Sequence, residues 1–373
     1  MFIPGRRARR LEIRALRIPF RQRFRHAAAE RSATETIWVR VQAADGTCGH
    51  GEGCPRPYVT GETMVTALAF CQAVQEEVAG LSGVDELQAW VAANEIRIDA
   101  NPAAWCAIEL ALLDLIGREE GQAVEALLAL PPLEGSFRYT AVLGAEDSST
   151  FAAQLENYLR REFRDFKAKL SGEPAADQGR LRHFAAHARS ARSLRLDANN
   201  RWRNPGDAVT ALRDLAADFF AVEEPLAAGN YAGLRRVAAE TGVRIILDES
   251  FLRREQFAAL GPLPGPWILN LRISKLGGLL RSLAVARRAI ELGVPVIIGC
   301  QVGETSLLTR AALALAMGIR DSALLGREGA FGTHLLSRDV VACPLEFGVG
   351  GILDVNACEF PGRPGFGLDV TEL

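Results

Sequence analysis

From about residue 136 to about residue 340, strand-like segments alternate with helix-like segments, and this alternation limits the possible folds more than any other feature. Strand-like runs lie at residues 137–144, 163–170, 193–200, 219–225, 243–250, 267–275 and 295–301. A helical periodicity follows each of them, as expected for a parallel sheet whose crossovers are helices. About seven such units fit a closed barrel better than an open sheet. No Gly-x-Gly-x-x-Gly opens a helix, which argues against a dinucleotide-binding fold. We therefore predict a TIM-type (β/α)7β barrel.

The segments on either side of the barrel have a different pattern. Residues 11–56 predict strands, with a hairpin turn at Ala44-Asp45-Gly46, and residues 62–118 predict helices. Strands followed by helices without alternation indicate a small α+β unit. The segment after residue 340 is rich in glycine and proline. We predict an α+β capping domain at residues 1–130, a barrel at residues 131–340, and a tail at residues 341–373 that returns to the capping domain.

Composition excludes several classes of protein. Apolar residues make up 49% of the chain, charged residues 24%, and the net charge is -2, so nothing drives binding to nucleic acid or to an anionic membrane. No apolar run reaches the ~18 residues that a membrane helix needs, and the basic start has no apolar core of a signal peptide. The seven cysteines are scattered without a Cys-x-x-Cys pair. We expect reduced thiols and a cytoplasmic protein.

Charged side chains end five successive predicted strands, where the catalytic residues of a parallel barrel lie. They are Lys167 and Lys169, Asp197 with Asn199, Glu223 and Glu224, Asp248 and Glu249, and Lys275. The spacing is about one strand–helix repeat, so we expect these residues at one height of the barrel mouth. Three neighbouring carboxylates repel one another unless a cation lies between them. Oxygen ligands alone suit Mg²⁺ better than zinc.

Lysines lie on both sides of these acids in the chain. Lys167 and Lys169 share a strand face because side chains alternate. We expect each to lower the pKa of the other, which makes Lys169 a candidate general base. Lys275 follows the acids and can approach the opposite face of a bound molecule. A single acid at a strand end is more often a helix cap or a surface ion pair, but chance explains five ordered strand ends poorly.

The order KAK, LDANN, VEEP, LDES and NLRISKLGG resembles the enolase superfamily, specifically its muconate-lactonizing-enzyme subgroup. RFRHA, GEGCPRPYVTGET, ELALLDLIGRE and FGVGG extend the resemblance over nearly the whole chain. The resemblance implies an isomerase that uses Mg²⁺, or Mn²⁺ as an alternative. It implies Asp197, Glu223 and Asp248 as metal ligands. Lys169 and Lys275 would be the acid–base pair, with Lys167 tuning Lys169.

The same resemblance implies contacts to a small-molecule carboxylate substrate. Loops of the capping domain that carry His26 and Tyr58 would select the substrate, and Glu304 in QVGETS would lie near it. The remaining candidates for substrate contact are Thr140, Asn199 and Cys300. Cys300 ends a predicted strand and could line the pocket, but a buried cysteine of this kind is more often an inert thiol. The implied chemistry is removal of the proton alpha to the carboxylate through a metal-stabilised enediolate, as in racemases, epimerases and muconate-type cycloisomerases.

Several alternatives stay open. A dehydratase or an o-succinylbenzoate-synthase-like lyase of the same superfamily would use the same groups, and a Schiff-base lyase would use a lysine as nucleophile. A binding barrel without catalysis is the non-enzymatic alternative. Dipeptide epimerases of the family carry Asp-x-Asp on the last strand to bind the substrate ammonium, whereas Ala330 and Gly332 stand at those places here. N-acyl amino acids and unsaturated diacids are therefore as well supported as dipeptides. We also expect a homo-oligomer.

Overall fold

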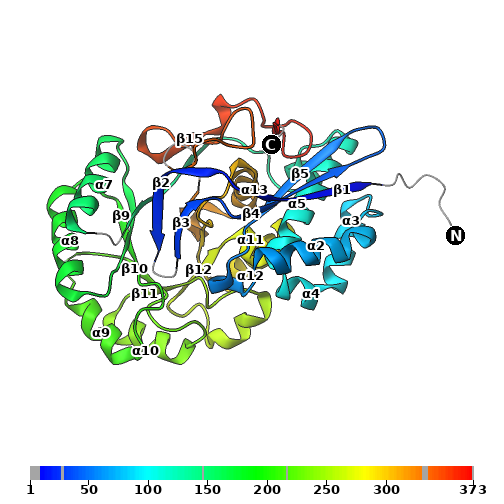
Figure 1. The fold of residues 1–373 in the computed structure, drawn as a ribbon. Coiled ribbons are helices and arrows are strands. Elements are labelled where there is room, and N and C mark those ends of the chain that lie inside the picture. The colour runs from blue at the N-terminus through cyan, green and yellow to red at the C-terminus, as the bar shows by residue number, and fades with distance from the viewer. Residues whose placement is uncertain (1–8, 27–28, 145–146, 216, 330–334, 372–373) are drawn as a thin grey trace.

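The computed structural model describes residues 9–26, 29–144, 147–215, 217–329 and 335–371. They form an N-terminal α+β part, a barrel of parallel strands with surrounding helices, and a C-terminal segment that contacts both (Figure 1). Among these residues, no helix is both long enough and apolar enough to cross a membrane.

The N-terminal part contains a three-stranded antiparallel sheet in the order β1-β4-β5 and a separate hairpin of β2 and β3. Its strands are β1 (Arg10–Leu16), β2 (Pro19–His26), β3 (Ala29–Ala33), β4 (Thr36–Gln42) and β5 (Cys48–Gly53). Its helices are α1 (Pro57–Thr60), α2 (Met64–Val78), α3 (Val84–Ala93), α4 (Glu95–Ala100), α5 (Pro102–Glu120) and α6 (Val124–Leu127). The turn predicted at Ala44-Asp45-Gly46 joins β4 to β5.

Glycines on alternate positions of β5 allow α5 to lie directly on the sheet. A Cβ added to Gly51 would lie 2.1 Å from the carbonyl oxygen of Ala107, and one added to Gly53 would lie 1.8 Å from that of Ala103. Side chains at alternate strand positions share one face, so this face of β5 consists of backbone alone. The apolar helix α5 is buried along most of its length as a result.

The barrel is an eight-stranded parallel sheet in sequence order, β7 to β14. Its strands are β7 (Ala141–Leu143), β8 (Asp165–Lys169), β9 (Ser193–Asp197), β10 (Ala221–Glu223), β11 (Arg244–Leu247), β12 (Trp267–Leu271), β13 (Val296–Ile298) and β14 (Leu324–Arg327). A 2.8 Å hydrogen bond from the Thr140 amide to the Arg327 carbonyl joins the first strand to the last. The order of the eight strands confirms the prediction of a (β/α)7β barrel.

The crossovers between these strands are mainly α-helices. They are α7 (Ser148–Arg160), α8 (Pro174–His187), α9 (Pro205–Arg213), α10 (Tyr231–Thr241), the 3₁₀ helix η1 (Arg254–Leu260), α11 (Ile273–Leu276), α12 (Leu279–Glu291) and α13 (Ser306–Met317). The helical segment expected after β11 is thus a 3₁₀ helix.

The interior of the barrel divides into an apolar floor and a polar mouth. The floor is a separate buried cluster of Ala221, Ile246, Ile268 and Ile297, one side chain from each of four neighbouring strands. Two residues further along β10 comes Glu223, and two further along β12 comes Asn270, both buried. Because alternate residues of a strand point inward, the charged residues at the strand ends lie above this floor.

The C-terminal segment packs on both other parts. Its strand β15 (Ile352–Asp354) pairs with β6 (Ser136–Arg138), and its 3₁₀ helices are η4 (Val349–Gly351) and η5 (Val355–Ala357). The segment expected as one strand at 137–144 is therefore two strands, because β6 pairs outside the barrel. The Phe366 amide donates to Asp114 on α5 at 2.8 Å. A further 3₁₀ helix, η2 (Asp321–Ala323), precedes β14.

Candidate active site

Strand register brings three of the predicted residues into one row. Lys169 on β8 pairs with Asp197 on β9, and Asp197 pairs with Glu223 on β10. Asp248 directly follows β11, the next strand. The carboxylates are almost inaccessible to water, with exposures of 2% for Asp197, 2% for Glu223 and 1% for Asp248. We call Asp197, Glu223 and Asp248 the carboxylate row.

Each end of the carboxylate row contacts a lysine. At one end, the Lys169 amine lies 3.5 Å from Asp197 Oδ2 and donates to Asn199 Oδ1 at 3.3 Å. At the other end, the Lys275 amine donates to Asp248 Oδ1 at 2.9 Å and to two backbone carbonyls. Lys275 lies on the one-turn helix α11 beyond β12 and not on the strand itself. The two lysines therefore flank the carboxylate row from β8 and from α11.

Lys167 lies one layer deeper in the barrel and is held by acids. Its amine lies 2.8 Å from Glu328 Oε1, 3.5 Å from Glu223 Oε2 and 3.6 Å from Asp197 Oδ2. Burial acts to lower the pKa of Lys167, but these carboxylates outweigh burial and raise it. The prediction of a lowered pKa for Lys167 is therefore wrong in its net direction, because it counted the two lysines without the acids around them.

The pKa of Lys169 does shift in the predicted direction. Burial is the largest cause that lowers it, the charge of Lys167 acts in the same direction, and Asp197 opposes both. The two lysines of the Lys-x-Lys motif therefore differ in environment although they share a strand face.

Glu328 and Arg195 form a second buried pair that the sequence did not reveal. Arg195 Nη2 donates to Glu328 Oε1 at 2.6 Å, and its Nη1 donates to the Thr140 hydroxyl at 3.2 Å. Glu328 follows the last strand, so it lies beside Lys167 only because the barrel closes. The pKa of Glu328 is lowered, since Lys167 and Arg195 outweigh the effect of burial.

Arg272 bridges two members of the carboxylate row. Its Nη2 pairs with Asp248 Oδ2 and lies 3.4 Å from Glu223 Oε1, and its Nη1 donates to Gln301 at 3.2 Å. In the part of the chain that the structure describes, no three acidic, histidine or cysteine side chains converge enough to hold a metal ion as they stand. A guanidinium therefore serves as a counter-ion for two of the predicted metal ligands.

The chemistry of the carboxylate row nevertheless fits Mg²⁺. Burial raises the pKa of Glu223 to about 7; Lys167 opposes this shift, and Asp197 and Asp248 add to it by repulsion. Three carboxylates that repel one another in a buried site favour a small divalent cation, and Mg²⁺ prefers such oxygen ligands. The residues present therefore suit the ion that the sequence predicts.

Strained backbone supports the carboxylate row. Asn199 and Asn200 after β9 have φ values of 47° and 58°, and Glu224 after β10 has a φ of 40°. Non-glycine residues in this region are uncommon and cluster at functional sites. Glu224 accepts hydrogen bonds from the Asp248 and Ser250 amides at 2.6 and 2.7 Å. It thereby fixes the backbone that carries Asp248, a role that its position in VEEP did not disclose.

The loop after β13 carries two further predicted residues. Cys300 and Glu304 are both buried, at 6% and 5% exposure. Burial raises the pKa of Cys300 well above its ordinary value and that of Glu304 to about 8. Glu304 Oε1 accepts a hydrogen bond from the Gln301 amide at 2.5 Å. Burial therefore acts against the charged form of both side chains.

The remaining residues predicted to contact the substrate lie in different surroundings and stay predictions. Thr140 is buried and bound by Arg195, and Asn199 accepts from Lys169. Tyr58 is partly exposed on α1, and its role stays a prediction. His26 ends β2, but its side chain is outside the described part of the chain, and Ala330 and Gly332 lie outside the described residues altogether.

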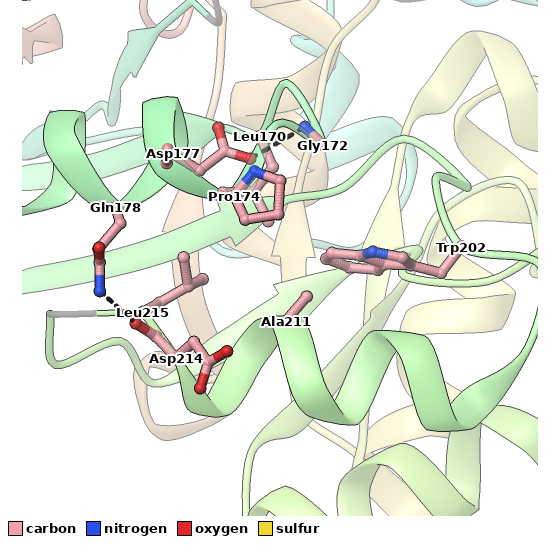
Figure 2. A pocket seen from close by; sticks show the side chains of 10 residues that line it. Leu170, Gly172, Pro174, Asp177, Gln178, Trp202, Ala211, Asp214 and Leu215 are labelled. Atoms are coloured by element: carbon pink, nitrogen blue, oxygen red, sulfur yellow. Dashed lines mark hydrogen bonds between the residues drawn. The ribbon is translucent and has the colours of Figure 1, made fainter.

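A separate cavity of about 330 Å³ lies between α8 and α9 (Figure 2). Trp202, Pro174 and Ala211 line it together with Asp177, which accepts from the Gly172 amide at 2.9 Å. The cavity shares no side chain with the carboxylate row or its lysines. We therefore do not assign the chemistry to it.

Comparison with known families agrees with the geometry. Residues 150–373 match the model described as "Enolase C-terminal domain-like", and residues 9–129 match "Mandelate racemase / muconate lactonizing enzyme, N-terminal domain". The chain belongs to the enolase superfamily. Within it, the chain is of the mandelate racemase/muconate lactonizing enzyme type, whose relatives here are isomerases. The predicted family and enzyme class are confirmed.

Relatives within the superfamily align over nearly the full chain. The L-Ala-D/L-Glu epimerase of Bacillus subtilis is 28% identical, covering 96% of this chain and 96% of that one. The N-succinyl-L-Arg/Lys racemase of Bacillus cereus is 23% identical, covering 97% and 95%. A solved structure of the Methylococcus capsulatus dipeptide epimerase, complexed with Mg and L-Arg-D-Lys, superposes with a TM-score of 0.83 at 26% identity, covering 96% and 99%.

Proposed function

We propose that the chain is a Mg²⁺-dependent racemase or epimerase that removes and returns the proton alpha to a substrate carboxylate. The observation that carries the proposal is the buried carboxylate row with a lysine at each end. A row of this kind offers ligands for a metal in the middle and an amine on either side. Relatives that are epimerases and racemases support the same reaction type.

In this proposal, Asp197, Glu223 and Asp248 bind the metal. Mg²⁺, when bound, would stabilise the negative charge that develops on the substrate carboxylate as the proton leaves. Lys169 and Lys275 exchange the α-proton on opposite faces of the substrate. Each amine is kept in place by its carboxylate at the end of the row.

Lys167 does not exchange protons in this proposal. Its amine is kept charged by Glu328 and the carboxylate row. A fixed positive charge beside the row attracts the substrate carboxylate and helps to hold it for reaction.

We further propose that the preferred substrate is an N-acyl amino acid and not one with a free α-ammonium. A buried ammonium needs a carboxylate partner, because an unpaired buried charge costs several kcal/mol. No acid occurs from Gly329 to Leu336, and Glu328 is engaged by Lys167 and Arg195. Glu304 is buried and accepts a hydrogen bond from the Gln301 amide at 2.5 Å.

The test is to measure α-proton exchange in D₂O by NMR. The purified chain is incubated with Mg²⁺ and with N-acetyl and N-succinyl amino acids, dipeptides or muconates. We expect deuterium at the α-carbon of N-acyl amino acids, and EDTA should abolish its incorporation. Mn²⁺ should restore it in place of Mg²⁺. Exchange that persists in EDTA would contradict the proposal.

The same assay separates the alternatives. Turnover of muconate without racemisation would favour a cycloisomerase. Covalent trapping of a lysine by borohydride in the presence of substrate would favour Schiff-base chemistry. Homo-oligomer formation and a cytoplasmic location stay predictions, which gel filtration and fractionation would test.

A further inference from the structure

The helix that carries Lys275 is too short to fix its own position. α11 is a single turn of four residues followed by Gly277 and Gly278. One turn of helix is marginal without tertiary contacts. The Lys275 side chain is fully buried, so its placement depends on what surrounds this turn.

The N-terminal part supplies those contacts. The Cys54 amide donates to the hydroxyl of Ser274, the residue before Lys275, at 2.7 Å. On the other side of the turn, a carboxylate oxygen of Glu109 on α5 accepts from the Leu280 amide at 3.0 Å. The turn that bears Lys275 is thus held between two segments of the N-terminal part.

The two glycines of the turn make room for this contact. A Cβ at Gly278 would lie 2.3 Å from the Glu109 carboxylate, and a Cβ at Gly277 would lie 2.7 Å from Ile98. Both glycines also have positive φ values, 80° and 100°. The Lys-x-Gly-Gly sequence therefore fits a close approach of α4 and α5 as well as a tight turn.

Burial and hydrogen bonds hold the Glu109 side chain in this position. Its residue is 0% exposed, and its second oxygen accepts from Trp105 Nε1 at 3.1 Å. Its carboxylate lies at the start of α12, a helix of 13 residues, where free amides and the helix dipole favour a negative charge. Burial raises the pKa of Glu109 to about 7, and the Leu280 amide, Trp105 and the charge of Arg281 act in the opposite direction.

We propose that Glu109 is a positioning residue for Lys275, acting from the N-terminal part through the Gly277-Gly278 turn. This inference rests on the proposed function, in which Lys275 serves one face of the substrate. The backbone of Lys169, by contrast, lies on β8 and is placed by the strand register of the barrel. A change at Glu109 therefore affects one of the two faces.

The test compares the two faces in the same preparation. Variants Lys169→Ala and Lys275→Ala first show which enantiomer exchanges through which lysine. Glu109→Ala should then slow exchange at the Lys275 face by about tenfold or more relative to the Lys169 face, because small displacements of a reacting group reduce rates strongly. Glu109→Gln keeps one acceptor oxygen and should show a smaller bias in the same direction.

Asp114→Asn is the matched control. Asp114 is a buried carboxylate on the same helix, but it accepts from the Phe366 and His50 amides instead of the Lys275 turn. Its substitution should leave the ratio of the two rates unchanged, whatever it does to stability. A general loss of folding would lower both rates together, so the ratio separates positioning from stability.

Hydrogen–deuterium exchange of the backbone supplies a second measurement. Residues 273–282 should exchange faster in Glu109→Gln than in Asp114→Asn. An unchanged ratio of rates in both Glu109 variants would overturn the inference while leaving the proposed function intact. If the unaltered protein exchanges the α-proton of neither enantiomer, the proposed function fails. The backbone measurement then still tests the inference: amide exchange at residues 273–282 that is unchanged in Glu109→Gln would show that Glu109 does not position the Lys275 turn.

Discussion

Replacing Arg272 with methionine should lower the free energy of unfolding of the metal-free protein and increase its affinity for Mg²⁺. Arg272 is largely buried, with a side-chain exposure of 11%, and bridges Asp248 and Glu223. Removing one partner of a buried ion pair costs about 3–5 kcal/mol. Asp248 keeps Lys275 at 2.9 Å and Glu223 keeps Asn270 at 3.0 Å, so we expect the lower end of that range.

The same interaction opposes metal binding. A cation that already neutralises two ligands must give them up, at least in part, before Mg²⁺ can use them. In the variant, Mg²⁺ does not have to displace Arg272. If the whole of about 3 kcal/mol is thereby added to the free energy of Mg²⁺ binding, the variant binds Mg²⁺ up to about 100-fold more tightly, since 1.4 kcal/mol is tenfold in Kd. Partial recovery gives a smaller gain in the same direction.

Calorimetric titration with Mg²⁺ and thermal unfolding with and without Mg²⁺ measure both effects. Arg310→Met is the matched control, because Arg310 is fully buried and pairs with Glu125 away from the carboxylate row. It should lower the stability without changing the affinity for Mg²⁺. Equal or weaker Mg²⁺ binding by Arg272→Met would refute this reasoning and make Arg272 a part of the metal-bound site.

Other expected outcomes concern the metal, the last strand, the substrate and pH. Asp197→Asn should abolish α-proton exchange and reduce Mg²⁺ affinity in calorimetry, because one of three charged ligands is lost. Glu328→Gln should lower the free energy of unfolding in urea by about 3–5 kcal/mol, since it leaves Lys167 and Arg195 without their shared partner. An N-acetylated L-Ala-L-Xaa dipeptide should have a higher kcat/KM than the free amine; a strong preference for the free amine would show that the interpretation of the last strand is wrong. Glu62 is buried and accepts hydrogen bonds from the Ala103 and Ala104 amides at the start of α5. Burial raises its pKa to about 7, so the folded chain binds more protons there than the unfolded chain. This acid therefore destabilises the fold increasingly as pH rises from about 4.5 to 7. Urea unfolding of Glu62→Gln should therefore show a stability that improves relative to the unaltered protein over that range.

The strand-end residues were predictable because one strand–helix repeat returns the chain to the same height of a barrel. That regularity predicts Lys169, Asp197 and Glu223 in one register, and the strand pairing has them there. It failed for Lys275, which lies on a helical turn after its strand. A short apolar run does not show where a strand ends and a helix begins.

The cations and acids that arrive from distant segments were not predictable in the same way. Arg195 and Glu328 meet through barrel closure, and Glu109 reaches the Lys275 turn through packing of the N-terminal part. In the sequence, Glu109 is one of several charged residues in a long helix that is otherwise mostly apolar. Its function in the structure depends on which backbone amides lie opposite it, and spacing along the chain carries no such information.

The central claim is that two lysines on either side of a metal-binding carboxylate row exchange the α-proton of one substrate. The most direct test measures deuterium incorporation from D₂O into each enantiomer of an N-acyl amino acid, using Lys169→Ala and Lys275→Ala with Mg²⁺ present. We predict that each variant loses exchange of one enantiomer and retains that of the other, with opposite preferences. Equal loss for both enantiomers in either variant, with Mg²⁺ binding unchanged, would contradict the assignment of one lysine to each face.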